Sequence, residues 1–312
     1  MSVDRKQLGE VRTHFGLLSN APITKDWFVV RAIGALASLD ATPMRLVLGG
    51  GTALARVHRL VQRMSEDVDF KIMPVADIGL SKSALNRQLG VLREKVSGAL
   101  ATAGFTLDGS MPHTRNERRY MLYHLPYEGD VTDAATLLRP TIQVELTYAP
   151  LRLDAVRLPV ASFVAEALGR EPEVPAVECV AITETAAEKL VALTRRTAMR
   201  IAGLSRDDDP ALVRHIYDLH VLREHYDPAT VADLASRIIR QDADTFANQY
   251  PAYRDDPMGE THKAVTTLTT DTLYAERYAE FHHHMVYGEV VPFTDALATV
   301  AALVEHLPKR LR

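Results

Sequence analysis

The stretch from Leu46 to Phe70, LVLGGGTALARVHRLVQRMSEDVDF, constrains the fold of this chain more than any other part of it. An apolar run ends in glycines and a threonine, and Asp67 and Asp69 follow in a segment that alternates charged and apolar residues. Side chains at i and i+2 of a β-strand point to the same face, so the two carboxylates should lie about 6–7 Å apart along one strand. Carboxylate oxygens in that arrangement can share hard divalent cations.

The glycines before the acidic pair predict a phosphate cradle. Gly50 and Gly51 let backbone N–H groups approach phosphate oxygens, and the helix expected after them adds a favourable dipole. The hydroxyl of Thr52 can donate to a phosphate, cap that helix, or do both. Ser65 precedes the acidic strand and is either a phosphate contact or an ordinary loop serine. A phosphate cradle that leads into an acidic pair is the pattern that nucleotidyl transfer requires.

A third carboxylate, Glu145, lies in the middle of the apolar sequence Ile142-Gln143-Val144-Glu145-Leu146. An unpaired charge in a strand is costly, so this residue should face either a structural arginine or a metal. The presence of Asp67 and Asp69 elsewhere favours the metal. Three carboxylates on two strands suit a two-metal mechanism, in which one ion activates the attacking hydroxyl and the other stabilises the leaving pyrophosphate.

Composition limits the classes of protein that the chain can belong to. A length of 312 residues suggests two domains, and the polar N-terminus and the lack of a long apolar run predict neither a secretory signal nor a membrane span. The single cysteine, Cys179, excludes an intrachain disulfide and fits a reducing cytoplasm. The net charge of −4 argues weakly against broad nucleic-acid binding, although arginines gather at 45–63 and 189–206.

Hydrophobic periodicity predicts an α/β (α+β) fold, with a mixed-sheet core over residues 1–170 and a helical C-terminal domain over residues 171–312. The Pro/Glu-rich stretch at 169–175 suggests the boundary. In the core, helices are expected at 3–18, 24–38, 51–62 and 81–103, and strands at 45–49, 66–72, 104–109, 118–126, 140–148 and 154–160. Gly104 is expected to end the helix at 81–103. In the second domain, helices are expected at 184–200, 209–224, 228–249, 271–285 and 293–307. The cluster Asp207–Asp209 is expected to provide an N-cap for the helix that begins at Pro210.

A lysine helix marks the second domain. Lys189 and Arg196 are seven residues apart and share a helix face. A lysine within an apolar stripe needs an acidic partner or a phosphate, and Asp218 on the following helix is the obvious acid. Lys189 is therefore expected to contact a nucleotide triphosphate while Asp218 orients it, or the two form an interhelical ion pair; both can hold.

Taken together, these motifs resemble the DNA polymerase β-type nucleotidyltransferase superfamily, and within it the AbiEii/AbiGii family of type IV toxin–antitoxin and phage-abortive systems. The resemblance covers about residues 44–222. One departure is His215, which stands where family members often carry an acid. The motifs are, in order, the Gly50-Gly51-Thr52 turn, the Asp67/Asp69 pair with Glu145, the helix Lys189-Leu190-Val191-Ala192-Leu193-Thr194-Arg195-Arg196, and the pattern Arg214-His215-Ile216-Tyr217-Asp218-Leu219.

The resemblance implies a toxin that transfers a nucleotide from an NTP (ATP, GTP or CTP) to RNA, at the 3′ end of tRNA, with Mg²⁺ or Mn²⁺ as the cofactor. It also implies a cognate antitoxin encoded next door. The expected catalytic residues are Asp67, Asp69, Glu145, Lys189 and Asp218, the first three also being metal ligands, and the expected nucleotide-binding residues are Gly50, Gly51, Thr52, Ser65, Lys189 and Arg196.

Two alternatives remain open at this point. The acceptor could be a hydroxyl of a small molecule or protein, which the net charge supports, or the chain could be a non-catalytic nucleotide-binding module. Two further patterns are ambiguous. His282-His283-His284 reads better as a solvated surface than as a metal site, and Arg115, Arg118 and Arg119 beside Tyr120 either touch nucleic acid or edge a hairpin.

Overall fold

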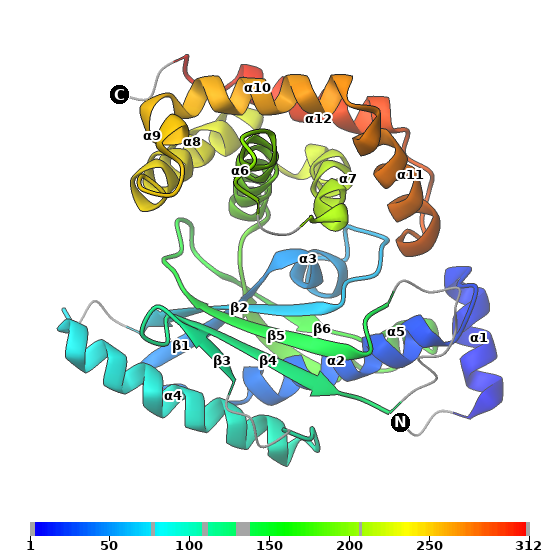
Figure 1. Cartoon of the computed structure of the whole chain (residues 1–312). Helices are drawn as coiled ribbons and strands as arrows, with labels where there is room; N and C mark the ends of the chain where they lie inside the picture. The colour runs from blue at the N-terminus through cyan, green and yellow to red at the C-terminus, as the bar shows by residue number, and fades with distance from the viewer. Residues whose placement is uncertain (1–3, 76–78, 108–111, 129–137, 206–207, 310–312) are drawn as a thin grey trace. The chain divides into compact units, whose positions relative to one another are not determined.

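The computed structural model describes residues 4–75, 79–107, 112–128, 138–205 and 208–309. The chain forms two compact units, residues 1–181 and 182–312. The first unit combines helices with a mixed sheet, and the described part of the second unit is helical (Figure 1). This confirms the predicted α/β class.

In the described part of the first unit, seven strands form one sheet in the order β3-β4-β5-β2-β1-β7-β6. The central strand β2 pairs antiparallel with β1 and parallel with β5. The strands are β1 (Met44–Gly49), β2 (Asp67–Pro74), β3 (His113–Arg115), β4 (Tyr120–Pro126), β5 (Thr141–Tyr148), β6 (Val156–Val160) and β7 (Val174–Cys179).

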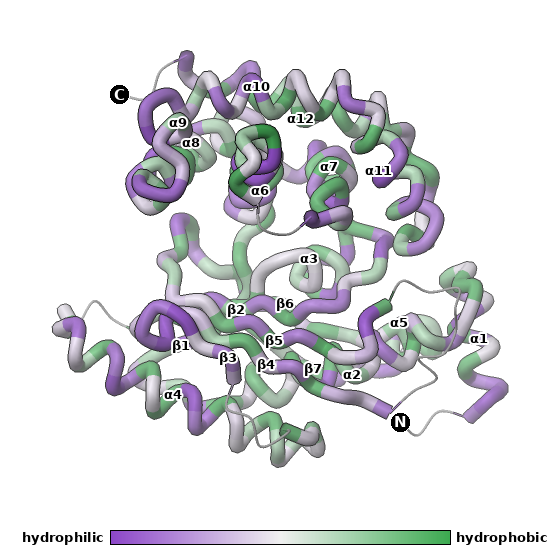
Figure 2. The backbone as a smooth tube through the Cα atoms, in the orientation of Figure 1, coloured by the Kyte–Doolittle hydropathy of each residue, from purple (hydrophilic) through white to green (hydrophobic). Residues whose placement is uncertain are grey.

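Two helices, α2 (Ala21–Ala37) and α4 (Lys82–Thr102), pack on one face of this sheet (Figure 1). Along β2 and β5 every second side chain is buried against them, because the strands alternate apolar and polar residues. Hydrophobic residues recur about once per turn along α4, between hydrophilic ones, as expected of a helix with one buried face (Figure 2). The unit also contains α1 (Arg5–Phe15), α3 (Gly50–Thr52), which continues as a π-helical turn (Ala53–Val57), and α5 (Phe163–Ala167).

The ends of α4 follow from local sequence. The hydroxyl of Ser81 accepts a hydrogen bond from the amide of Ala84 at 3.3 Å and caps the first turn. At the other end Gly104 adopts φ +83°, and the amide of Phe105 donates to the carbonyl of Leu100 at 3.1 Å. This is the glycine-terminated helix end that the sequence predicts.

Several predicted boundaries differ from the structure. The helix expected at 51–62 ends at Val57, because Arg59 adopts a left-handed conformation with φ 55° and turns the chain out of the helix. No strand forms over 104–107, and the remainder of the segment expected at 104–109 lies outside the described residues. A short strand forms instead at β3 and pairs with β4.

Strand β7 extends the first unit beyond the boundary predicted near residue 170. It pairs with β1 on one side and β6 on the other, so the sheet continues through Cys179 and the first unit runs to Ala181. Burial alternates only over the last three residues of the strand, Val177 to Cys179, and the prolines and glutamates of the stretch 171–175 give its start the composition of a linker.

The second unit is built on α6 (Ile182–Ile201), which packs against α8 (Pro228–Thr245) and α10 (Pro257–Thr270). The expected helices form, but α9 (Pro251–Asp255) and α10 were not predicted; Pro251 and Pro257, which suggest breaks, stand at the first helical positions. The remaining helices are α7 (Arg214–Val221), which follows a 3₁₀ turn (Pro210–Val213) and precedes another (Arg223–His225), α11 (Thr272–Met285) and α12 (Phe293–Glu305).

Among the described residues, no helix is both long and apolar enough to cross a bilayer.

The glycine-terminated end of α4 gives a stability prediction. Gly104→Ala should lower the free energy of unfolding by about 1–2 kcal/mol, because alanine is strained in the left-handed region. Gly98→Ala, at an exposed helical position of α4 with no atom within 4 Å of the new methyl group, should raise it by about 0.5–1 kcal/mol. Urea unfolding of both variants measures the difference. Equal effects would contradict this account of the helix end.

Candidate active site

The three predicted carboxylates lie on one face of two neighbouring strands. Asp69 of β2 stands directly opposite Glu145 of β5 in the parallel register, and Asp67 stands opposite Gln143. Adjacent strands are separated by about 4.8 Å, so the register sets Asp69 beside Glu145. The alternate residues Val68 and Val144 are fully buried on the opposite face. The predicted acidic face therefore forms, and packing on the other side of the sheet fixes its orientation.

The glycine turn abuts this face. Gly49 pairs with Asp69 in the antiparallel β1–β2 register, and Gly50 adopts φ +68°. A methyl group on Gly50 would collide with the carboxylate of Asp69, and one on Gly51 would lie 3.0 Å from the Ser65 hydroxyl. The backbone of this turn can approach the Asp69 carboxylate closely because residue 50 is a glycine and has no Cβ.

Thr52 is fully buried and ties the turn to the acidic strand. Its hydroxyl donates to the backbone carbonyl of Asp67 and lies 2.8 Å from the hydroxyl of Ser65. In the structure this hydroxyl positions the start of β2, and Ser65 lies next to the turn. The turn, Thr52, Ser65 and the acidic pair are therefore brought together.

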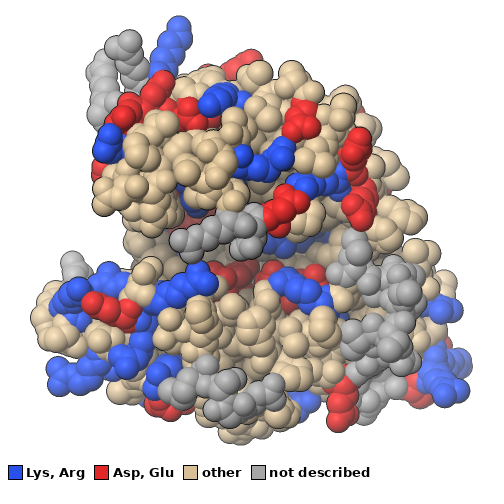
Figure 3. Space-filling model, viewed as in Figure 1, with Lys and Arg blue, Asp and Glu red and all other residues tan. Residues whose placement is uncertain are grey.

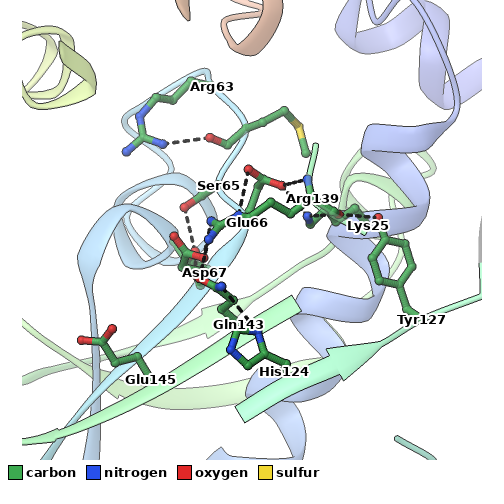
Figure 4. A network of polar contacts seen from close by, with 12 residues as sticks. Lys25, Arg63, Ser65, Glu66, Asp67, His124, Tyr127, Arg139, Gln143 and Glu145 are labelled. Carbon is green, nitrogen blue, oxygen red and sulfur yellow. Dashed lines mark hydrogen bonds and ion pairs between the residues drawn. The ribbon is translucent and has the colours of Figure 1, made fainter. Parts of the chain in front are cut away.

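A polar network around Asp67 was not foreseen from the sequence (Figure 4). One guanidinium nitrogen of Arg139 lies 2.5 Å from Oδ1 of Asp67, and the other donates to Oε1 of Gln143. The backbone amide of Arg139 donates to Glu66 at 2.6 Å, and its carbonyl accepts from Nζ of Lys25 at 2.7 Å. Lys25, which is fully buried in α2, also forms an ion pair with Glu66.

These contacts shift the pKa values of the two cations in opposite directions. Burial lowers the pKa of Lys25 below its ordinary value, although Glu66 opposes this effect. Burial would also lower the pKa of Arg139, but the charges of Asp67, Glu66 and Asp69 and the hydrogen bond to Asp67 together outweigh burial, so the pKa of Arg139 is raised. The guanidinium therefore stays charged beside Asp67.

Glu145 has different neighbours. Its carboxylate accepts a hydrogen bond from the Tyr120 hydroxyl at 3.0 Å and lies apart from the contact between Asp67 and Arg139 (Figure 4). Burial raises the pKa of Tyr120, and the charge of Glu145 raises it further, so the hydroxyl remains a proton donor to the carboxylate. The sequence predicted either a structural arginine or a metal as the partner of Glu145. The structure adds a third kind of partner, the hydroxyl of Tyr120.

The donor set fits a hard divalent cation in its chemistry. Asp67, Asp69 and Glu145 offer carboxylate oxygens on one face, which are the ligands that Mg²⁺ and Mn²⁺ prefer. Within the described part of the chain, no group of three or more Asp, Glu, His or Cys side chains is arranged to hold a metal ion. His282, His283 and His284 therefore do not form such a group. At Asp67 the positive charge is supplied by Arg139.

The second unit contains the other predicted residues. Nζ of Lys189 lies 2.7 Å from Oδ2 of Asp218, and both side chains are buried, so the predicted pairing of helices α6 and α7 forms. Arg196 is half exposed and contacts Asp209 at 3.0 Å. Asp209 makes no side-chain cap to the turn that follows, so it does not act as the N-cap that its position suggests.

His215, which stands in place of an acid, is buried next to this pair. Burial lowers its pKa well below the ordinary value, and the positive charges of Lys189 and Arg214 lower it further. The imidazole is therefore neutral at pH 7. Its Nδ1 has no hydrogen-bond partner among the described residues.

Sequence analysis did not select three residues that lie at the site, namely Gln143, Tyr120 and Arg139. Gln143 lies two residues before Glu145, so the same strand periodicity that selected Asp67 could have selected it. Tyr120 reaches Glu145 from the neighbouring strand β4, and Arg139 reaches Asp67 from the end of a segment that lies mostly outside the described residues. Both contacts depend on strand order, which a single sequence does not display.

A mixed sheet that holds three carboxylates beside a glycine turn presents the donor groups that nucleotidyl transfer requires. A family model described as the nucleotidyl transferase AbiEii toxin of type IV toxin–antitoxin systems matches residues 31–299. The chain belongs to this family, and it is a nucleotidyltransferase toxin of a type IV system, as the resemblance in its motifs indicated.

Among solved structures, the chain is similar to MenT4, a nucleotidyltransferase toxin from Mycobacterium tuberculosis H37Rv. The two are 21% identical with a TM-score of 0.44, over 73% of this chain and 68% of that one. No curated protein matches the sequence significantly.

The contact between Gly50 and Asp69 can be tested by substitution. If Asp69 is a catalytic carboxylate, Gly50→Ala should lower nucleotide transfer by about 100-fold, because displacing such a group by about 1 Å has an effect of that order. Gly16→Ala is the matched control, since Gly16 has φ +64° but open space around its Cβ position. Both variants incur similar backbone strain, so equal activity in steady-state assays would contradict the assigned contact.

The buried pair in the second unit yields a stability prediction. Asp218→Ala should lower the free energy of unfolding by about 3–5 kcal/mol, because it leaves Lys189 buried without this carboxylate. Asp209→Ala removes the partner of the half-exposed Arg196 and should change it by less than about 1 kcal/mol. Chemical denaturation distinguishes the two. A small effect at Asp218 would show that the pair is not structurally important.

Proposed function

We propose that the toxin transfers a nucleoside monophosphate from an NTP to an RNA hydroxyl, at the 3′ end of tRNA, in a reaction that depends on Mg²⁺ or Mn²⁺. The observation that carries the proposal is the register that sets Asp69 beside Glu145, with Asp67 on the same face. The family supports nucleotidyl transfer and an antitoxin partner. Blocking tRNA would stop translation and growth, which is the outcome expected of a toxin in abortive defence.

Asp67 and Asp69 are proposed to hold the divalent cations, together with Glu145. When bound, the cations would lower the pKa of the attacking hydroxyl and neutralise charge on the triphosphate and the leaving pyrophosphate. Glu145, hydrogen-bonded by Tyr120, would help to accept the proton of the acceptor hydroxyl. The phosphorus–oxygen bond to the acceptor forms in line as the bond to pyrophosphate breaks.

Backbone amides of Gly50 and Gly51 are proposed to donate to the triphosphate. Two features support this role: the left-handed conformation of Gly50 and the buried hydroxyl of Thr52, which fixes the turn against β2. Ser65, next to Thr52, would add a hydroxyl contact to the phosphates.

Lys189 is proposed to contact the triphosphate while Asp218 orients its ammonium group. The short distance between them supports the orienting role and equally supports a structural ion pair. Arg196, half exposed on the same helix, would add a second cation for the nucleotide. The neutral His215 would leave Asp218 as the acid for Lys189.

An RNA acceptor is favoured by the hairpin that joins β3 to β4. Arg115 stacks over Tyr120 and Arg119 stacks over Tyr148, at 5.9 and 5.6 Å from the ring centroids. Lys and Arg side chains gather at the end of the first unit that carries this hairpin and the start of α4 (Figure 3). Guanidinium groups and aromatic planes beside Glu145 are suited to phosphates and unstacked bases.

The hairpin is also strained, because Asn116, Glu117 and Arg118 have φ values of 50°, 57° and 66°. Such strain persists where surrounding contacts maintain it, and Arg118 donates to Asn86 of α4 at 2.7 Å. Strained backbone often accompanies functional segments.

Since NTPs and tRNA are cytoplasmic, we propose that the enzyme acts in the cytoplasm.

A labelling assay tests the proposal. Purified toxin is incubated with Mg²⁺, total tRNA and each α-labelled NTP in turn. At least one of the NTPs should label the tRNA. Asp69→Asn should reduce the label by more than about 1,000-fold if the carboxylate holds the reacting metal. The control is Glu94→Gln, at an exposed position of α4, which should retain full activity.

Other outcomes discriminate between the alternatives. Labelling of a small molecule or protein in place of RNA would move the acceptor to that class. Nucleotide binding without transfer to any acceptor, together with toxicity that survives Asp69→Asn, would contradict catalysis as the basis of growth arrest.

A further inference from the structure

The carboxylate of Asp67 already has a cationic partner. Nη2 of Arg139 donates a charge-assisted hydrogen bond to Oδ1 of Asp67. A divalent cation binds a carboxylate oxygen at about 2.1 Å. A cation on Oδ1 and a guanidinium at hydrogen-bond distance from the same oxygen would repel each other.

The two ends of Arg139 are held differently. Its backbone amide is bound by Glu66 and its carbonyl by the fully buried Lys25, which itself pairs with Glu66. The side chain is 37% exposed, so its guanidinium borders solvent. The backbone is therefore an anchor, and the side chain can move without disturbing the core.

Movement of the guanidinium away from Asp67 would leave it with other acceptors. Its Nη1 donates to Gln143, and its Nε lies 3.6 Å from the carboxylate of Glu66 (Figure 4). A charged group that retains two polar partners and access to water loses little solvation when one contact breaks. The arrangement thus suits exchange of one cation for another.

We propose that Arg139 is a resident counter-ion of Asp67 in the metal-free toxin, and that the divalent cation displaces it when the site is loaded. This inference rests on the proposed metal role of Asp67. In the metal-free state, Arg139 relieves repulsion among Glu66, Asp67 and Asp69, which lie close together on one chain segment. Arg139 is a positioning residue, since it acts through the carboxylate.

The proposal predicts that loss of Arg139 tightens metal binding. With nucleotide absent, Arg139→Gln should bind Mn²⁺ about tenfold more tightly than the wild type, which corresponds to about 1.4 kcal/mol. Titration of the full-length, metal-free protein, followed by the electron paramagnetic resonance of free Mn²⁺, measures this affinity. A residue needed only for structure would give weaker binding or none when removed.

Thermal unfolding gives a second readout. In EDTA, Arg139→Gln should melt below the wild type, because Asp67 loses this counter-ion. Saturating Mn²⁺ should raise the melting temperature of Arg139→Gln by more than that of the wild type. The matched control is Arg237→Gln, which breaks an exposed arginine–aspartate pair in the second unit and should leave Mn²⁺ affinity unchanged.

The outcomes separate this inference from the proposed function. If Asp67→Asn abolishes Mn²⁺ binding but Arg139→Gln binds no more tightly than the wild type, Arg139 does not compete and the inference is overturned alone. If the wild type binds no Mn²⁺ at this site even with an NTP, the inference and the proposed metal site both fail.

A measurement on the wild type covers the case in which Arg139→Gln does not fold. The Nε–Hε resonance of Arg139, assigned by its absence in Arg139→Lys, should shift when Mg²⁺ is added to the metal-free protein. An unchanged resonance at saturating Mg²⁺ would overturn the displacement.

Discussion

Parallel pairing of β2 with β5 determines where every other part of the candidate site must lie. The register sets Asp69 beside Glu145, while Val68, Phe70, Val144 and Leu146 fill the core below the sheet. A slip of one residue would turn the carboxylates toward α2 and α4 and expose the apolar residues. The free energy gained by burying one face therefore fixes the chemistry of the other.

Concentrating acids on that face has an electrostatic cost, and the surrounding residues offset it. Glu66 is neutralised by the buried Lys25, Asp67 contacts Arg139, and Glu145 accepts a hydrogen bond from the Tyr120 hydroxyl. Each partner is a positive or hydrogen-bonding group where a divalent cation would otherwise supply the charge. The same negative potential that suits a metal thus requires resident partners while the metal is absent, and those partners come from α2, β4 and the segment before β5.

Local patterns predicted the features that depend on local geometry. Alternation in the sequences around Asp69 and Glu145 located both strands, Gly104 located the end of α4, and the apolar stripe around Lys189 indicated its pairing with Asp218. Features that depend on distant contacts were not predicted. The contact of Arg139 with Asp67 follows from strand order. Strand β7 was missed because the stretch 171–175, in which it begins, is rich in proline and glutamate. The helix after the glycine turn ends early because Arg59 adopts a left-handed conformation. The roles of the site residues stay predictions.

The most direct test of the central claim is a crystal structure of the toxin with Mn²⁺ and a non-hydrolysable NTP, with an anomalous difference map collected at the manganese absorption edge. The account predicts an anomalous peak within coordinating distance of Asp67 and Asp69, with the triphosphate against the Gly50–Gly51 turn. Bound nucleotide whose manganese lies elsewhere, with both aspartates free of metal, would contradict it.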